Sequence, residues 1–98
     1  MTTKSKKETG LAIVICIEKD DPGYHAFCPK LKGLHVYGRT EAEAAKNAKD
    51  AILAYLMSLV NHDEPIPAGL FYRAGDSRVE DACPQTESIV QRLELVPV

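Results

Sequence analysis

The sequence predicts an α+β fold in which one helix packs on one face of a three- to four-stranded antiparallel sheet, in the order β-β-β-α-β. Apolar residues recur at helical spacing in one long segment, residues 40–61, which carries both a start and a stop signal. A run of β-branched residues and two shorter strand-like segments precede it, and a partly alternating segment follows near the end of the chain. At 98 residues, the chain is expected to form a single domain with a modest core.

The first strand is predicted from Leu11 to Glu18, where a continuous apolar run indicates a central strand that is covered on both faces. Residues 19–23 combine charges with proline and glycine, which is typical of a tight turn, and a returning strand follows from Tyr24 to Cys28. A third short strand is expected from Leu34 to Tyr37. Alternation along the second strand predicts two faces, one with Tyr24, Ala26 and Cys28 and the other with His25 and Phe27.

The helix is predicted from Thr40 to Asn61. Thr40 can cap the first turn, and the carboxylate of Glu43 can reach back to the N–H of the cap itself. Asn61 can take a left-handed turn at the end, and two prolines mark the exit. The side facing the sheet is predicted to carry Ala45, Ala48, Ile52, Tyr55, Leu56 and Leu59.

The remaining segments give weaker signals. Residues 1–10 are polar and are expected to form an N-terminal tail outside a domain that spans 11–98. Residues 68–88 show no clear period and are interpreted as a long connection. The partial alternation from Ile89 to Val98 predicts the last strand, with proline near its end.

Composition indicates a cytoplasmic protein that contacts no membrane. The formal net charge of −2 gives no general attraction to nucleic acid, and neither a signal peptide nor a membrane-spanning run is expected. Three cysteines are present, and Cys16 and Cys28 lie inside predicted strands, where reduced thiols behave as small apolar groups. We therefore expect no structural disulfide and a free surface thiol at Cys83.

An ordered set of motifs resembles the HicB antitoxin family. It comprises an aromatic strand ending in proline, a Leu-x-Gly turn with a following Leu, a Gly-x-Thr-x-x-Glu-Ala helix start, and a proline-bracketed exit. In this chain these are Tyr24-His-Ala-Phe-Cys-Pro29, Leu31 with Gly33-Leu34, Gly38-Arg-Thr40-Glu-Ala-Glu-Ala-Ala45, Asn47-Ala48, Ala51-Ile52 and Pro65-Ile-Pro67.

The resemblance implies a partial ribonuclease-H-like fold and a non-catalytic protein that binds a HicA-type toxin and blocks its cleavage of messenger RNA by occlusion. Family members typically carry a C-terminal DNA-binding module. The residues after Pro67 contain no second capped helix and no basic recognition segment, so we expect this module to be missing and DNA binding to be doubtful.

An orphan oligomer without a toxin partner is the main alternative. A metal-dependent nuclease would need carboxylates such as Glu18 and Asp50 to meet, whereas ordinary turn and surface chemistry explains both. A zinc site would need His25 and His35 to meet Cys16 and Cys28, but no metal-binding spacing is present. We expect no catalytic residue, metal or cofactor.

Two expectations concern partners. A strand that is apolar on both faces, with one helix to cover it, leaves an apolar face, which predicts a homodimer or a higher homo-oligomer. The candidate residues for contact with the toxin are Asp20, Asp21, Tyr24, His35 and Tyr37, since acidic groups suit a basic RNA-binding partner.

Overall fold

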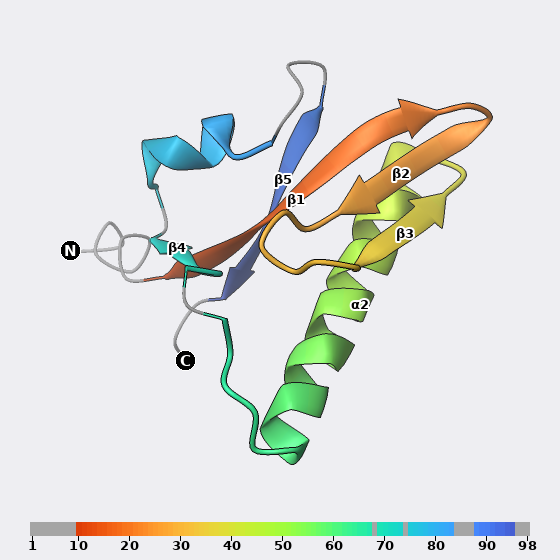
Figure 1. Cartoon of the computed structure of the whole chain (residues 1–98). Helices are drawn as coiled ribbons and strands as arrows, with labels where there is room; N and C mark the ends of the chain where they lie inside the picture. Colours follow the sequence, from red (N-terminus) through yellow and green to blue (C-terminus); the bar gives the residue numbers. More distant parts are fainter. Residues whose placement is uncertain (1–9, 68, 74, 84–87, 96–98) are drawn as a thin grey trace.

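The sheet is built around β1, which is the central strand (Figure 1). A computed structural model describes residues 10–67, 69–73, 75–83 and 88–95. In chain order, its elements are β1 (Leu11–Asp20), β2 (Gly23–Phe27), β3 (His35–Gly38), α2 (Glu41–Asn61), β4 (Tyr72–Arg73), the 3-10 helix η1 (Ser77–Asp81) and β5 (Ile89–Leu95). The predicted fold class is confirmed, and the predicted tail of residues 1–10 lies outside the described residues except for Gly10.

Strand registers place β2 and β4 on one side of β1 and β5 on the other. Ile17 pairs with Ala26 of β2 and also with Ile89 of β5. Ala12 pairs with Tyr72 of β4 and with Glu94 of β5. A strand has only two edges, so β2 and β4 follow each other along the same edge. β3 pairs with the outer edge of β2, and all pairings are antiparallel.

α2 covers one face of this sheet. The odd-numbered isoleucines of β1 face it and are buried, together with Ala26 of β2 and Cys28, which follows that strand. Alanines in the first half of α2 allow the backbone to come close to the sheet, and contact is tightest at Gly38. A Cβ atom at position 38 would lie only 2.7 Å from the Cα atom of Ala44, so only glycine fits there.

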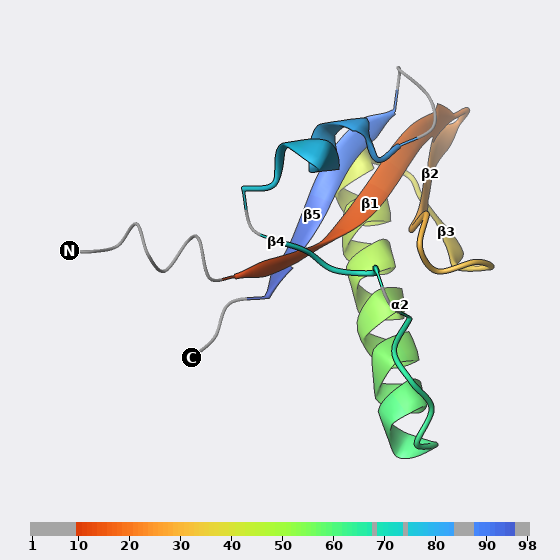
Figure 2. The same cartoon turned by 60° about the vertical axis from the view of Figure 1, so that its left-hand side comes forward.

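The second half of α2 runs past the sheet, as Figures 1 and 2 both show. Ile52 and Leu59 are buried as predicted, but Tyr55 is 41% exposed and does not belong to the core. The periodicity correctly indicated which side of the helix is apolar. It contained no information on where the sheet ends, so the prediction for Tyr55 was wrong.

Both ends of α2 are capped by side chains or backbone groups. The hydroxyl of Thr40 accepts a hydrogen bond from the N–H of Glu43 at 3.0 Å. The carboxylate of Glu43 accepts from the N–H of Arg39 at 2.6 Å, one residue before the cap rather than from Thr40 itself as predicted. At the other end, the left-handed residue is Asp63, with φ of 55°, and not Asn61.

Asp63 completes a Schellman motif. The N–H of Glu64 donates to the carbonyl of Leu59 at 2.8 Å, and the N–H of Asp63 donates to the carbonyl of Val60 at 3.2 Å. These bonds satisfy two carbonyls that the end of the helix leaves without partners.

The connection predicted for residues 68–88 contains structure that sequence reasoning missed. Leu70 is fully buried in the core beneath α2, and β4 follows directly. η1 then crosses the second face of β1, where Val79 packs against Val14 and Cys16. Arg78 binds the carboxylate of Asp76 at 2.7 Å, and this hydrogen bond lowers the pKa of Asp76 to about 2.

A disulfide fixes this cover to the sheet. Cys16 of β1 is bonded to Cys83, which follows η1, with 5.7 Å between their Cα atoms. The prediction of a free Cys83 and no disulfide was therefore wrong. The expectation of a bare second face, from which oligomerisation was predicted, was also wrong, because the chain's own segment covers Val14 and Cys16. Within the described residues, no helix is both long and apolar enough to cross a membrane.

Replacing Asp63 with glycine should stabilise the protein. A left-handed residue with a Cβ atom is strained by roughly 1–2 kcal/mol, so Asp63→Gly should raise the free energy of unfolding by about 1 kcal/mol. The same change at Asn61, which is still helical, should lower it by a similar amount. Urea denaturation of both variants measures the two effects. If both variants changed the free energy of unfolding in the same direction, the assignment of Asp63 as the left-handed residue after the helix would be contradicted.

Loss of the disulfide should destabilise the protein. The bond joins residues that are 67 positions apart, so Cys83→Ser should lower the free energy of unfolding by about 2–4 kcal/mol under oxidising conditions. A reductant should bring the native sequence to a similar value and leave the variant unchanged. If the reductant did not change the free energy of unfolding of the native sequence, the presence of the disulfide would be contradicted.

Cys28 should react slowly in the folded protein. Burial raises the pKa of its thiol, so less thiolate is present at a given pH, and the sulfur is also shielded. Alkylation by iodoacetamide at mildly alkaline pH should accelerate when denaturant is added without reductant, and should then modify only Cys28. Equal rates in the folded and unfolded protein would contradict its burial.

Candidate partner-binding face

η1 covers only part of the second face of the sheet. On the part formed by β2 and β3, the described residues leave His35 and Tyr37 exposed, while His25 and Phe27 are half-buried and Phe27 packs against the cluster under η1. His25 lies opposite Tyr37, and Phe27 lies opposite His35, in the antiparallel register of the two strands. Directly opposite residues share a face, and so do residues two apart on one strand. These four side chains therefore form one surface, which we call the aromatic face.

The rings of the aromatic face stack on one another. The centroids of His25 and His35 are 5.0 Å apart with an angle of 5° between the rings, and Phe27 lies 5.4 Å from His25 and 5.8 Å from His35. Nε2 of His25 and Nδ1 of His35 are 2.8 Å apart, so one nitrogen donates a hydrogen bond to the other. Flat rings with polar nitrogens offer both apolar contact and hydrogen bonding, which suits a protein interface.

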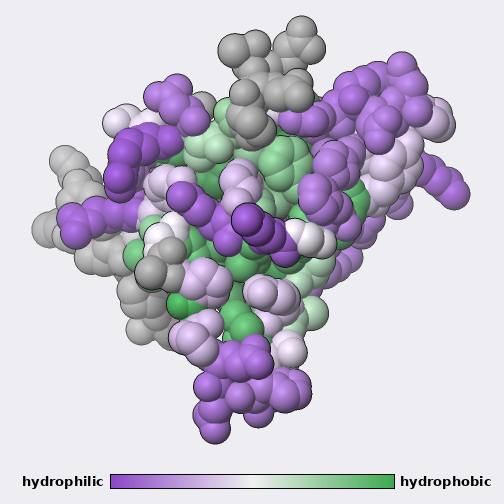
Figure 3. Space-filling model, in the orientation of Figure 1, coloured by the Kyte–Doolittle hydropathy of each residue, from purple (hydrophilic) through white to green (hydrophobic). Residues whose placement is uncertain are grey.

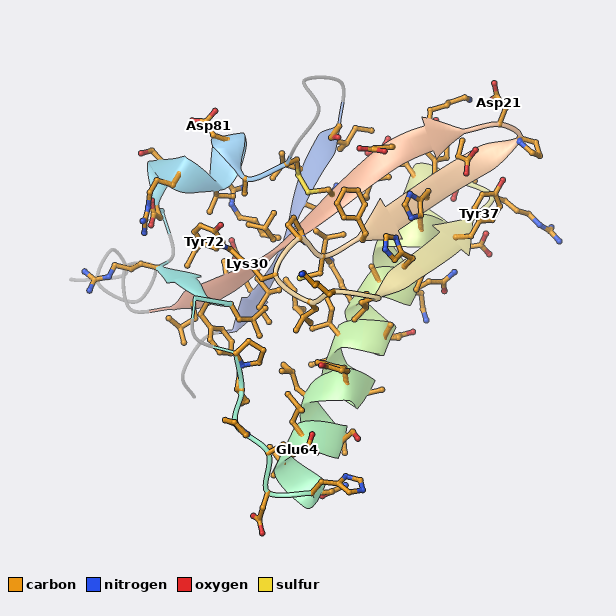
Figure 4. The ribbon with its side chains drawn as sticks, in the orientation of Figure 1. Asp21, Lys30, Tyr37, Glu64, Tyr72 and Asp81 are labelled. Atoms are coloured by element: carbon orange, nitrogen blue, oxygen red, sulfur yellow. A yellow bond between two sulfur atoms is a disulfide. The ribbon has the colours of Figure 1, made fainter. Side chains whose placement is uncertain are left out.

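Tyr37 connects this face to the acidic turn between β1 and β2. Its side chain is 47% exposed, and its hydroxyl donates to the carbonyl of Asp20 at 3.0 Å. Figure 4 shows Tyr37 and Asp21 at the same corner of the molecule. The amide of Asn47 donates to the carbonyl of Tyr37 at 2.8 Å, so α2 holds β3 in place from behind. These two hydrogen bonds therefore hold Tyr37 in a fixed position at this corner.

A groove of about 500 Å³ adjoins the aromatic face, between β3 and α2. It is lined by the start of β3 with the turn before it and by small residues and one tyrosine of α2: Lys32, Gly33, Leu34, His35, Val36, Ala51, Ala54 and Tyr55. In the described part of the chain, β3 pairs only with β2, so its outer edge faces this groove unpaired. His35 belongs to both the groove and the stack.

The structure places four of the five residues predicted to contact a partner at the acidic turn or on the aromatic face. Asp20, Asp21 and Tyr37 lie at this corner, and His35 lies two residues before Tyr37 on the same face. Tyr24 instead points to the side that α2 covers and has the amine of Lys19 5.1 Å from its ring centroid. Their role in binding stays a prediction.

Sequence reasoning did not include His25 and Phe27 among the contact residues. Alternation had already placed them on the face away from Tyr24. The missing information was the register between β2 and β3, which alone brings them beside His35 and Tyr37.

Other candidate chemistry does not assemble. Cys28 is buried on the α2 side and Cys16 is in the disulfide, so neither thiol meets the histidine pair. Glu18 accepts a hydrogen bond from Ser88 at 2.9 Å, while Asp50 is held by Lys46 on α2, also at 2.9 Å. Among the described residues, no three His, Cys, Asp or Glu side chains are grouped as a metal site requires.

Sequence comparison finds relatives among small proteins. No protein-family model matches the chain. It is 48% identical over 54 residues to the UPF0150 protein ssr1765 of Synechocystis, a match that covers 54% of this chain and 68% of that protein. It is 44% identical over 54 residues to the UPF0150 protein Ta0767 of Thermoplasma acidophilum, covering 54% of this chain and 78% of that protein.

Structure comparison finds the same fold in antitoxin structures. The N-terminal domain of the Burkholderia pseudomallei antitoxin HicB superposes with a TM-score of 0.63 at 22% identity, covering 84% of this chain and 94% of that domain. A chain of the HicA3 and HicB3 toxin-antitoxin complex superposes with a TM-score of 0.61 at 24% identity, covering 83% and 93%. The chain thus belongs to the UPF0150 family, and its fold is that of the HicB N-terminal domain.

Proposed function

We propose that this protein is a non-catalytic antitoxin that binds a HicA-type messenger-RNA-cleaving toxin in the cytoplasm and neutralises it by occluding its active surface. The observation that carries the proposal is the fold, which matches the HicB N-terminal domain over most of both chains. A second superposing chain comes from a structure described as a complex of HicA3 and HicB3.

The aromatic face and its acidic corner are the surface that we assign to the toxin. The stacked rings of His25, Phe27 and His35 supply flat contact area, and aromatic residues are enriched where binding energy concentrates. Asp20 and Asp21 lie at the exposed tip beside it and would attract a basic RNA-binding protein. The groove along β3 gives an extended segment of the partner a place to pair with a free strand edge.

A nuclease function is not supported by the placement of the acidic residues. Glu18 is on the second face of the sheet, and Asp50 is on α2, which covers the first face. Two-metal catalysis needs carboxylates around ions only a few Å apart. The remaining alternative, an oligomer without a toxin, is separated from the main proposal by the experiment below.

The test is co-expression with a short basic HicA-like protein encoded beside this one. The two proteins should co-purify, and growth arrest by the toxin should be relieved. Replacing His35 or Tyr37 with alanine should weaken the affinity by about tenfold or more, because truncating a central aromatic contact usually costs over 1 kcal/mol. Asp21→Lys should slow association, and the effect should shrink at high salt.

Ser58→Ala provides the matched control, because Ser58 is exposed on α2 away from the aromatic face. It should leave affinity and rescue unchanged. A complex that tolerates every substitution at the aromatic face would mean that the toxin docks elsewhere. Absence of both complex and rescue would favour the orphan oligomer.

A further inference from the structure

The disulfide lies in the same cross-strand row as two rings of the aromatic face. Cys16 of β1 is directly opposite Phe27 of β2, and Phe27 is directly opposite His35 of β3. Directly opposite residues of antiparallel strands lie side by side on one face of the sheet. The bridge from Cys16 to Cys83, the yellow bond in Figure 4, is therefore on one side of Phe27, and His35 is on the other.

Phe27 belongs to two groups of side chains at once. It packs against the cluster beneath η1, to which Ala82 and Cys83 also contribute. Its ring also stacks with those of His25 and His35. In Figure 3, hydrophobic residues are visible between the hydrophilic surfaces of η1 and of the β1–β2 turn. Because the rotamer of a packed side chain depends on all its neighbours, Phe27 can transmit a change in the η1 cluster to the stack.

The disulfide is the strongest link between η1 and the sheet. Val79 of η1 is 1% exposed, whereas Ser77, Arg78 and Asp81 of the same helix are exposed. The guanidinium of Arg78 also lies 5.9 Å from the ring centroid of Tyr72 in β4, but a cation–π contact at an exposed site contributes little. The position of the segment against Phe27 therefore depends on whether the bond is formed.

We propose that the Cys16–Cys83 disulfide is a redox switch that controls the aromatic face and its affinity for the toxin. With the bond formed, Cys83 is held beside Phe27, and this ring supports the stacked histidines. With the bond reduced, Cys83 is released, Phe27 loses a neighbour, and the stack loses its support on that side. Reduction therefore weakens the complex. This regulation depends on the antitoxin function proposed above.

The reductant is a cytoplasmic thiol, either a small molecule or a dithiol protein. Its thiolate attacks Sγ of Cys83, which is half-buried, rather than that of Cys16, which is fully buried. The attack forms a mixed disulfide on Cys83 and releases Cys16 as a thiolate, which takes up a proton. A second thiol of the reductant then displaces Cys83 in the same way. Two reductant thiols are thus oxidised to one disulfide, and both cysteines become thiols.

Two observations favour a switch over a bond that only stabilises the fold. Disulfides are rare in the cytoplasm, and those found there in mesophiles are usually transient or redox-sensing. In addition, the core cluster between β1 and α2 contains neither Cys16 nor Cys83. Reduction therefore changes the second face of the sheet and leaves the main core in place.

The first experiment uses the chain alone and follows its three histidines by NMR. Dithiothreitol should move the imidazole C–H resonances of His25 and His35, because the ring of Phe27 beside them moves. The resonances of His62, at the end of α2, should stay in place and provide an internal control. Resonances of His25 and His35 that are unchanged by the reductant would overturn the proposal.

Two cysteine variants show which thiol is responsible. Cys83→Ser should give the spectrum of the reduced chain with or without dithiothreitol. Cys28→Ala should respond to dithiothreitol like the native chain, because Cys28 is unbonded and lies on the α2 side of the sheet. Circular dichroism should confirm that the reduced chain and both variants are folded. A Cys83→Ser variant that still responds to the reductant would contradict the switch.

The second experiment measures affinity for the HicA-like protein by surface plasmon resonance. Dithiothreitol should weaken binding of the native chain by about fivefold or more, the lower end of the usual coupling between two sites. Cys83→Ser should bind weakly in both conditions. Phe27→Leu retains both cysteines but lacks the ring, so it should bind weakly and respond much less to the reductant than the native chain.

The outcomes separate the switch from the antitoxin function. Equal affinity of the native chain in both redox states, or tighter binding after reduction, overturns the switch and leaves the antitoxin function standing. A loss of affinity that is as large in Cys83→Ser also overturns it, because the reductant then acts on the toxin. Absence of a complex in both states contradicts the antitoxin function and any regulation of it, and the histidine resonances then show separately whether the disulfide controls the aromatic face.

Discussion

Burial of β1 on both faces is the constraint on which the rest of the structure depends. Ile13, Ile15 and Ile17 need a cover on one side, and α2 supplies it over the first half of its length. Val14 and Cys16 need a cover on the other side, and η1 supplies it through one apolar residue, Val79. Cys83, which follows η1, adds the disulfide to Cys16. A strand of this kind cannot lie at an edge, so β2, β4 and β5 flank it.

Neither cover matches the sheet in size, and two exposed surfaces follow from that mismatch. η1 is shorter than the sheet is wide, so the β2–β3 part of the second face is only partly covered and carries the aromatic face. α2 is longer than the sheet, so several large apolar residues of its second half are exposed within the described part of the chain. One surface is flat, aromatic and beside acidic groups, and the other is a line of aliphatic side chains. The two surfaces therefore lie on different elements and differ in chemistry.

Local signals predicted much of this fold. Alternation assigned the faces of β2 correctly, a cap motif located the start of α2, and unbroken hydrophobicity identified β1 as central. The predictions that failed concerned contacts between residues that are far apart in the sequence. Cys16 and Cys83 are paired only because η1 crosses the sheet, and η1 itself has one buried apolar residue among charged neighbours, which creates no period. For the candidate site, single residues such as His35 and Tyr37 were found, but the stack required the strand register.

The disulfide also determines how the molecule opens. Segments that are held by few buried contacts normally open separately, at a lower free energy than the whole domain. η1 has few such contacts, yet its bond to Cys16 joins it to the strand that is most deeply buried. With the bond formed, η1 stays tethered to β1 through Cys83, so it cannot move far from the second face of the strand even when its own contacts break. With the bond broken, η1 becomes a separate unit, and the second face of β1 can open to solvent while the core beneath α2 stays intact.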